Sequence, residues 1–107
     1  MATPRPGARV RGSRSGRPIM AALDLLGRRW ALRILWELRG GALSFRALRS
    51  ACGDVSPAVL NTRLAELRDA GLLENTDEGY AVTNAGRELG RALDPLARWA
   101  ERWARTR

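Results

Sequence analysis

The sequence contains no histidine and no lysine, and it has a single cysteine, Cys52. Without histidine, the chain lacks the most common general base and transition-metal ligand. One cysteine excludes an internal disulfide framework and an all-cysteine metal site. The glycines are scattered rather than grouped into a phosphate-binding loop, and no carboxylate pair stands out in an apolar setting. We therefore expect no enzymatic activity, no cofactor and no metal site.

Long apolar runs are also missing. The uncharged apolar stretches are far shorter than the ~20 residues that a membrane-spanning helix requires. No apolar signal-peptide core follows the basic N-terminus, so we expect a cytoplasmic protein without membrane contact. Hydrophobic residues nevertheless make up 45% of the 107 residues, which is sufficient for one globular domain with one core.

Charge of one sign dominates. All nineteen basic residues are arginine, and with eleven acidic residues they give a net charge of +8. The choice of arginine over lysine is consistent with a codon preference, whereas the net charge indicates a nucleic-acid partner, with RNA or a membrane surface as alternatives on charge alone. Residues 1–18 carry five arginines and no acid, so the remaining residues have a net charge of only +3.

Residues 1–18 are also rich in proline, glycine and serine, so we predict a disordered basic arm. Two interpretations stay open for it: contact with DNA phosphates or a minor groove, and a solvated tail. Residues 19–107 form the predicted folded domain.

The apolar spacing in this domain predicts helices over about residues 19–27, 28–39, 45–51 and 57–70. Ser44 is a candidate N-cap, and Ser56-Pro57 combines a capping serine with proline at the first helical position. Strands are expected over 72–76 and 80–83 around an Asp-Glu-Gly turn, with Thr83 capping a final helix to about residue 105. Pro95 predicts a kink or break in that helix. The fold class is therefore mainly α with a small β-hairpin: a winged helix-turn-helix.

Short motifs follow one another along residues 20–103. They are Leu23-Asp24-Leu25-Leu26-Gly27-Arg28-Arg29-Trp30, Ile34-Leu35-Trp36-Glu37-Leu38, Phe45 and Leu48 after Leu43, Val55-Ser56, Leu60-Asn61-Thr62-Arg63-Leu64, Glu66-Leu67, Gly71-Leu72, Tyr80-Ala81-Val82-Thr83 with Gly86 and Leu89, and Leu93 with Pro95 and Trp99. Each is weak alone, but the ordered set resembles the HxlR-type regulators, a MarR-like winged-helix family. The resemblance implies a homodimer that binds operator DNA, with the first and last helices forming the dimer interface.

The chain departs from that family pattern in three ways. Many members carry a cysteine just before the first helix, where this chain has Ile19-Met20. Sensing through that cysteine is therefore not expected. The predicted wing is short, and its tip is acidic, with Glu74, Asp77 and Glu78. Because acidic side chains repel phosphate, wing contact with DNA is in doubt.

The helix over 57–70 is the predicted recognition helix. With Leu60, Leu64 and Leu67 turned inward, its N-terminal half presents a short polar face. The base-edge candidates on this face are Ser56, Ala58, Asn61 and Thr62. Asparagine pairs with adenine, and alanine or threonine methyl groups can contact thymine. An ordinary solvated helix face is the alternative.

Three further side chains near this helix have open roles. Arg63 either contacts a phosphate or packs its stem on the core with its head paired to Glu66 or Asp54. Arg46, on the preceding helix, is a candidate phosphate contact that positions the protein without reading sequence. Cys52 is expected to be a buried core thiol, because redox chemistry requires exposure and a lowered pKa.

The predicted dimer interface is apolar. Four tryptophans exceed what a small core can hide, and tryptophan is favoured at interfaces. We assign this interface to Leu23, Leu93, Leu96, Trp99 and Trp103.

These features predict a sequence-specific, dimeric DNA-binding regulator that reads a pseudo-palindromic operator on double-stranded DNA. A winged-helix module that binds protein partners without reading DNA is the alternative, and the acidic wing supports it. A third hypothesis is non-specific DNA coating through the arm. A crevice beside the last helix could hold a small hydrophobic effector, by fold analogy alone.

Overall fold

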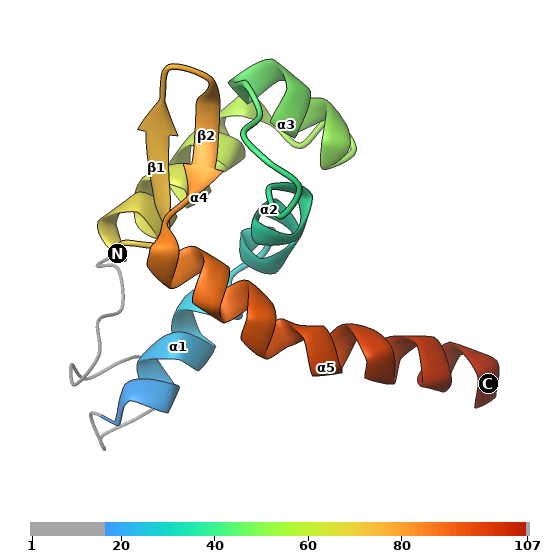
Figure 1. Ribbon diagram of the computed structural model, residues 1–107. Coiled ribbons are helices and arrows are strands. Elements are labelled where there is room, and N and C mark those ends of the chain that lie inside the picture. The colour runs from blue at the N-terminus through green and yellow to red at the C-terminus, as the bar shows by residue number, and fades with distance from the viewer. Residues whose placement is uncertain (1–16, 107) are drawn as a thin grey trace.

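The computed structural model describes residues 17–106, which form five helices and one two-stranded sheet (Figure 1). The elements in chain order are α1 (Pro18–Leu26), α2 (Ala31–Glu37), α3 (Phe45–Ala51), α4 (Pro57–Asp69), β1 (Leu73–Thr76), β2 (Gly79–Val82) and α5 (Asn84–Thr106). This is the winged helix-turn-helix expected from the sequence. Residues 1–16 of the predicted arm lie outside the described residues. The last residue of the predicted arm, Pro18, is the first residue of α1.

One hydrophobic core joins α2, α3 and α4 to the start of β1. The stripe predicted on α4 forms its centre, with Leu60, Leu64 and Leu67 exposed by 0%, 2% and 0%. The inner face expected of the second helix is buried as well, including Ile34 and Leu38. Burying these side chains stabilises the fold by roughly 1.5–3 kcal/mol each before conformational entropy is counted.

Two of the predicted helices differ from expectation. α2 begins at Ala31 rather than at residue 28, because Trp30 adopts a left-handed backbone with φ 78° and residues 27–30 form a turn. α1 buries Ala21 and Leu25, whereas Ile19 and Leu23 from its expected apolar face remain 55% and 57% exposed. The apolar side of α1 therefore lies only partly against the core.

The break predicted at Pro95 is wrong, because α5 runs without interruption from Asn84 to Thr106. Proline removes one backbone donor, but strong helix formers such as alanine, leucine and arginine flank it on both sides and propagate the helix. At the other end, the Thr83 hydroxyl accepts a hydrogen bond from the Gly86 backbone N–H at 3.2 Å, which confirms the predicted cap. Figure 1 shows the C-terminal part of α5 extending beyond the rest of the domain.

The wing is an antiparallel hairpin in which Leu73 pairs with Val82 and Thr76 with Gly79. No third segment of the sheet was predicted, yet Leu43 joins the hairpin through a bridge to Tyr80. Gly79 is required there, since a Cβ atom at this position would clash with the Leu43 carbonyl. The loop after α2 is thereby tied to the wing, which fixes the start of α3.

Candidate nucleic-acid interface

Helices α3 and α4 form the helix-turn-helix, and each begins at a serine cap. The Ser44 and Ser56 hydroxyls accept hydrogen bonds from the backbone N–H groups of Ala47 and Val59, both at 3.1 Å. The turn between the helices contains Gly53 and Asp54, with φ 77° and 60°. These caps and the tight turn confirm that the sequence locates α4 and its N-terminus correctly.

The N-terminal face of α4 is open to solvent. Ser56, Ala58, Asn61 and Thr62, the predicted base-edge candidates, are all exposed and lie within two turns of the helix start. The Thr62 hydroxyl donates back to the Ala58 carbonyl at 3.0 Å, which leaves its methyl group available for contact. Within residues 17–106 the Asn61 amide forms no hydrogen bond. The structure thus presents an unoccupied amide and small side chains where a recognition helix would meet base edges.

The two arginines of α3 have different surroundings. Arg46 is exposed and makes no ion pair with any described residue, as suits a phosphate contact. Arg49 is part-buried, and its Nε donates to the Val55 carbonyl at 2.7 Å. Arg49 therefore holds the turn between the two helices.

Arg63 forms internal contacts. Its Nε donates to the Arg29 carbonyl at 2.7 Å, and its Nη1 donates to Glu66 Oε1 at 3.0 Å. The pairing with Glu66 that the sequence offered as an alternative is thus formed. Glu66 also receives a hydrogen bond from Arg28 Nη1 at 2.6 Å. Sequence reasoning missed this second arginine, because the separation of 38 residues leaves no local signal.

The wing tip carries only acidic side chains among its charged groups. Glu74, Asp77 and Glu78 are all exposed. The Thr76 hydroxyl closes the turn by donating to the Gly79 carbonyl at 2.8 Å and accepting from the Glu78 N–H at 3.1 Å. This acidic tip would repel DNA phosphates if it approached them.

A second surface, on α1 and the outer part of α5, is apolar. Leu96, Trp99 and Trp103 are each 48–49% exposed, and the two indole rings stack at 5.4 Å between centroids. Leu23 on α1 is 57% exposed, and Leu93 is half-buried. Monomeric domains rarely expose so many large apolar side chains on neighbouring turns of one helix.

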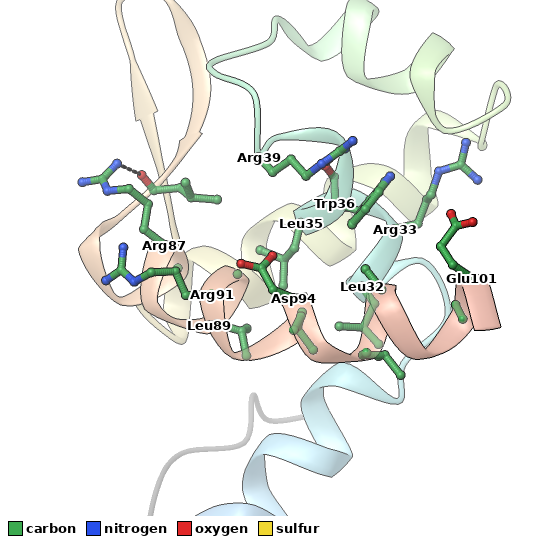
Figure 2. Close-up of a pocket in the computed structure, with 17 residues that line it drawn as sticks. Leu32, Arg33, Leu35, Trp36, Arg39, Arg87, Leu89, Arg91, Asp94 and Glu101 are labelled. Carbon is green, nitrogen blue, oxygen red and sulfur yellow. Dashed lines mark hydrogen bonds between the residues drawn. The ribbon is translucent and has the colours of Figure 1, made fainter. Parts of the chain in front are cut away.

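A groove of about 710 Å³ runs between α2 and α5 (Figure 2). Leu32, Trp36 and Leu89 contribute to its apolar lining, together with Leu93 and Leu96 of the apolar surface on α5. Arg91 and Asp94 are among its charged residues. The Arg39 guanidinium lies over the Trp36 ring, 3.6 Å from its centroid. Sequence reasoning did not single out Leu32 and Trp36, although their spacing of four along a helix, off the buried face, was a usable signal.

Cys52 is 1% exposed and belongs to the core, as predicted. Burial raises the pKa of its thiol, with the charge of Arg33 opposing the shift and that of Glu37 adding to it. Among residues 17–106, no group of three or more histidine, cysteine or acidic side chains could hold a metal ion. No helix in this part of the chain is both long and apolar enough to cross a membrane.

Comparison with known proteins agrees with this geometry. Residues 25–107 match the model of the HxlR-like helix-turn-helix family. The Bacillus subtilis HTH-type transcriptional regulator YvaP is 29% identical over 89 residues, covering 77% of this chain and 82% of that protein.

Solved structures show the same likeness. Quinone-bound YodB from B. subtilis superposes with a TM-score of 0.73 at 27% identity, over 78% of this chain and 96% of that one. A possible HxlR family transcriptional factor from Thermoplasma volcanium gives a TM-score of 0.69 at 29% identity, over 78% and 82% of the two chains.

Proposed function

The chain belongs to the HxlR-like helix-turn-helix family of transcriptional regulators, which are DNA-binding proteins and not enzymes, and from this premise we propose that it reads a specific operator as a homodimer. The exposed N-terminal face of α4 carries the proposal. It combines a capped helix start with the Asn61 amide, which has no hydrogen-bond partner among residues 17–106. In the proposed complex, Ser56, Ala58, Asn61 and Thr62 contact base edges, while Arg46 contacts a phosphate.

Arg63 has a different place in this proposal. Its bonds to Arg29 and Glu66 hold it against the body of the domain. We therefore assign Arg63 the role of packing on the domain with its head group paired to Glu66, which was one of the two alternatives from the sequence. At most one edge of its guanidinium would then face a phosphate.

The proposed dimer forms through the apolar surface of α1 and α5. Leu23, Leu93, Leu96, Trp99 and Trp103 would be covered by the same residues of a second copy, as a two-fold interface requires. Two α4 helices about 34 Å apart would then read successive major grooves on one face of the duplex. A pseudo-palindromic operator follows from that symmetry. We also propose that the protein acts in the cytoplasm.

Selection of bound sequences from random DNA, followed by mobility-shift titration at about 150 mM salt, tests the proposal. We expect one enriched pseudo-palindrome. Asn61→Ala with Thr62→Ala should weaken binding to it at least about tenfold, or ~1.4 kcal/mol, and leave the dimer intact. Asn75→Ala is the matched control, because it removes the same amide from the exposed acidic hairpin.

Two outcomes would contradict the proposal. Wild-type binding without sequence preference would favour non-specific coating, which deletion of residues 1–18 should then abolish. Unchanged operator affinity in the Asn61/Thr62 variant would favour a protein-interaction module. Under our proposal, the deletion lowers affinity but leaves the sequence preference intact.

We place a small hydrophobic effector in the groove between α2 and α5. Its apolar lining and size support this assignment, and the quinone bound by YodB shows that one structural neighbour takes a small molecule. We expect 1,4-naphthoquinone to release a Cys52→Ala variant from its operator without covalent reaction. Adding Ala97→Trp, which fills the groove, should remove that response, and equal release from both variants would contradict the assignment.

A further inference from the structure

A compact ion-pair network joins the turn after α1 to the recognition helix. Arg28, which follows α1, donates from Nη1 to Glu66 Oε2 on α4 at 2.6 Å. Its Nη2 lies 3.4 Å from Asp24 Oδ2, one turn back on α1. The side chains of Arg28, Glu66 and Asp24 are only 8%, 13% and 16% exposed. The network is therefore largely removed from solvent and links two elements that are distant in sequence.

Arg63 completes this network from α4 itself. It donates to the second oxygen of Glu66, Oε1, and to the Arg29 carbonyl in the same turn. Both oxygens of one carboxylate are thus held by arginines, one from each side of the contact. Because Arg63 also bonds the backbone of the turn, α4 is attached to that turn at two separate points.

Hydrophobic packing alone does not require such an arrangement. Removing charges from water is costly, and a buried ion pair is often no more stabilising than apolar side chains of similar volume. Hydrogen bonds to a carboxylate are directional, however, and two arginines on one carboxylate restrict rotation as well as distance. The network therefore adds orientation to a contact that apolar side chains could hold without it.

The orientation of α4 matters because a small rotation about Glu66 produces a large displacement at the N-terminal end of the helix. The base-edge residues begin at Ser56, about ten residues before Glu66, or ~15 Å along the helix. A swing of ~15° about Glu66 would move that end by ~4 Å, comparable with the ~3.4 Å step between base pairs. A loosely held helix would thus reach half-sites that differ in spacing by one base pair.

We propose that Arg28, Glu66 and Arg63 are positioning residues that fix the angle of α4 against α1, so that the dimer accepts one half-site spacing. This inference rests on the proposed function, in which α1 belongs to the dimer interface and α4 reads DNA. The network then connects the part of each subunit that sets the dimer geometry to the part that meets the operator.

Operators that carry the selected half-sites at the optimum spacing and at one base pair more or less test this role. Wild-type protein should bind the optimum at least about tenfold more tightly, ~1.4 kcal/mol. In Glu66→Gln the ratio of the affinity for the optimum spacing to the affinity for the altered spacings should fall below about threefold, while the preferred half-site sequence is unchanged. All the DNAs carry the same phosphates, so the altered charge of the variant changes its affinity for each of them equally. This effect therefore cancels in the ratio of affinities.

Two further variants make the result interpretable. Arg28→Met with Glu66→Met replaces the closest ion pair of the network by apolar side chains, and it should show the same loss of spacing discrimination. Glu37→Gln is the matched control, because it disrupts the 2.7 Å Arg33–Glu37 pair on α2, which is more exposed and does not touch α4. Glu37→Gln should retain the wild-type ratio.

Sedimentation of each variant separates the possible failures. Folded, dimeric variants that keep the wild-type spacing ratio would overturn the positioning role and leave the proposed function standing. Loss of folding in both the Glu66→Gln and the double methionine variants would assign the network to stability and overturn it as well. A wild-type protein that is monomeric or shows no sequence preference would refute the proposed function, and this inference with it.

Discussion

The stacked tryptophans of α5 allow a quantitative test of the dimer. Trp99 and Trp103 are 48% and 49% exposed and belong to the C-terminal half of α5. A tryptophan buries up to about 250 Å² in a complete interface, so roughly 100 Å² of each remains to be covered. At ~25 cal/mol per Å² this is about 2.5 kcal/mol per side chain, or ~5 kcal/mol for the two copies in a dimer.

Trp103→Ala should therefore raise the dimer dissociation constant by about a thousandfold or more. The loss need not reach the full area-based figure, because area converts imperfectly into affinity. Sedimentation velocity over a wide range of concentrations measures this constant, and the variant should remain folded because the side chain lies outside the core. A dimer of nanomolar affinity would thus become one of micromolar affinity.

Trp36→Ala is the matched control. Trp36 has a similar exposure of 45%, but it lies on α2, where it lines the groove together with Leu93 and Leu96, and it is not one of the residues assigned to the interface. It should change the dissociation constant by less than about threefold, well under 1 kcal/mol. If Trp103→Ala dimerised as tightly as wild type, or if Trp36→Ala weakened the dimer equally, the assignment of the interface to α5 would be refuted.

Leu64→Ala removes a side chain that is 2% exposed and should lower the free energy of unfolding by about 2–5 kcal/mol, measured by urea denaturation at a fixed protomer concentration; a loss below ~1 kcal/mol would contradict its central place in the core. Burial raises the pKa of the Cys52 thiol in the folded protein. The stability that comes from burying the neutral thiol is therefore complete below the ordinary thiol pKa and is lost as the pH rises through the raised pKa of the folded state. Wild-type stability should therefore decline at alkaline pH more steeply than that of Cys52→Ala, and parallel pH profiles would argue against a buried thiol. Arg46→Ala should weaken binding to all DNA sequences alike and reduce the slope of log affinity against log salt by about one for each subunit; a change confined to the selected operator would instead show that Arg46 reads bases.

Local signals in the sequence were sufficient for most of the fold. Ser44 and Ser56 predicted the starts of α3 and α4, because a capping serine satisfies backbone donors of its own helix. The Leu60, Leu64 and Leu67 spacing identified the buried face of α4, and hence its exposed one. These features depend on residues a few positions apart, so no knowledge of the rest of the chain was needed.

Three other features were not predicted from the local pattern. Trp30 takes a left-handed backbone and delays α2, Leu43 joins the wing, and α5 passes through Pro95 without a break. Trp30 shows that helical periodicity does not locate the first residue of a helix, and at Pro95 the helix formers on both sides outweighed the local cost of proline.

The candidate site also combines features that follow from local sequence with features that follow from tertiary structure. The sequence by itself determined where α4 begins and which of its faces is polar, since both follow from helical periodicity and capping. Only the tertiary structure decided that Arg63 turns to Glu66 and Arg29, that Arg28 reaches the same carboxylate, and that α2 and α5 enclose a groove. The physical reason is that ion pairs and grooves depend on how elements are placed in space, and long side chains have several partners within reach until folding selects one.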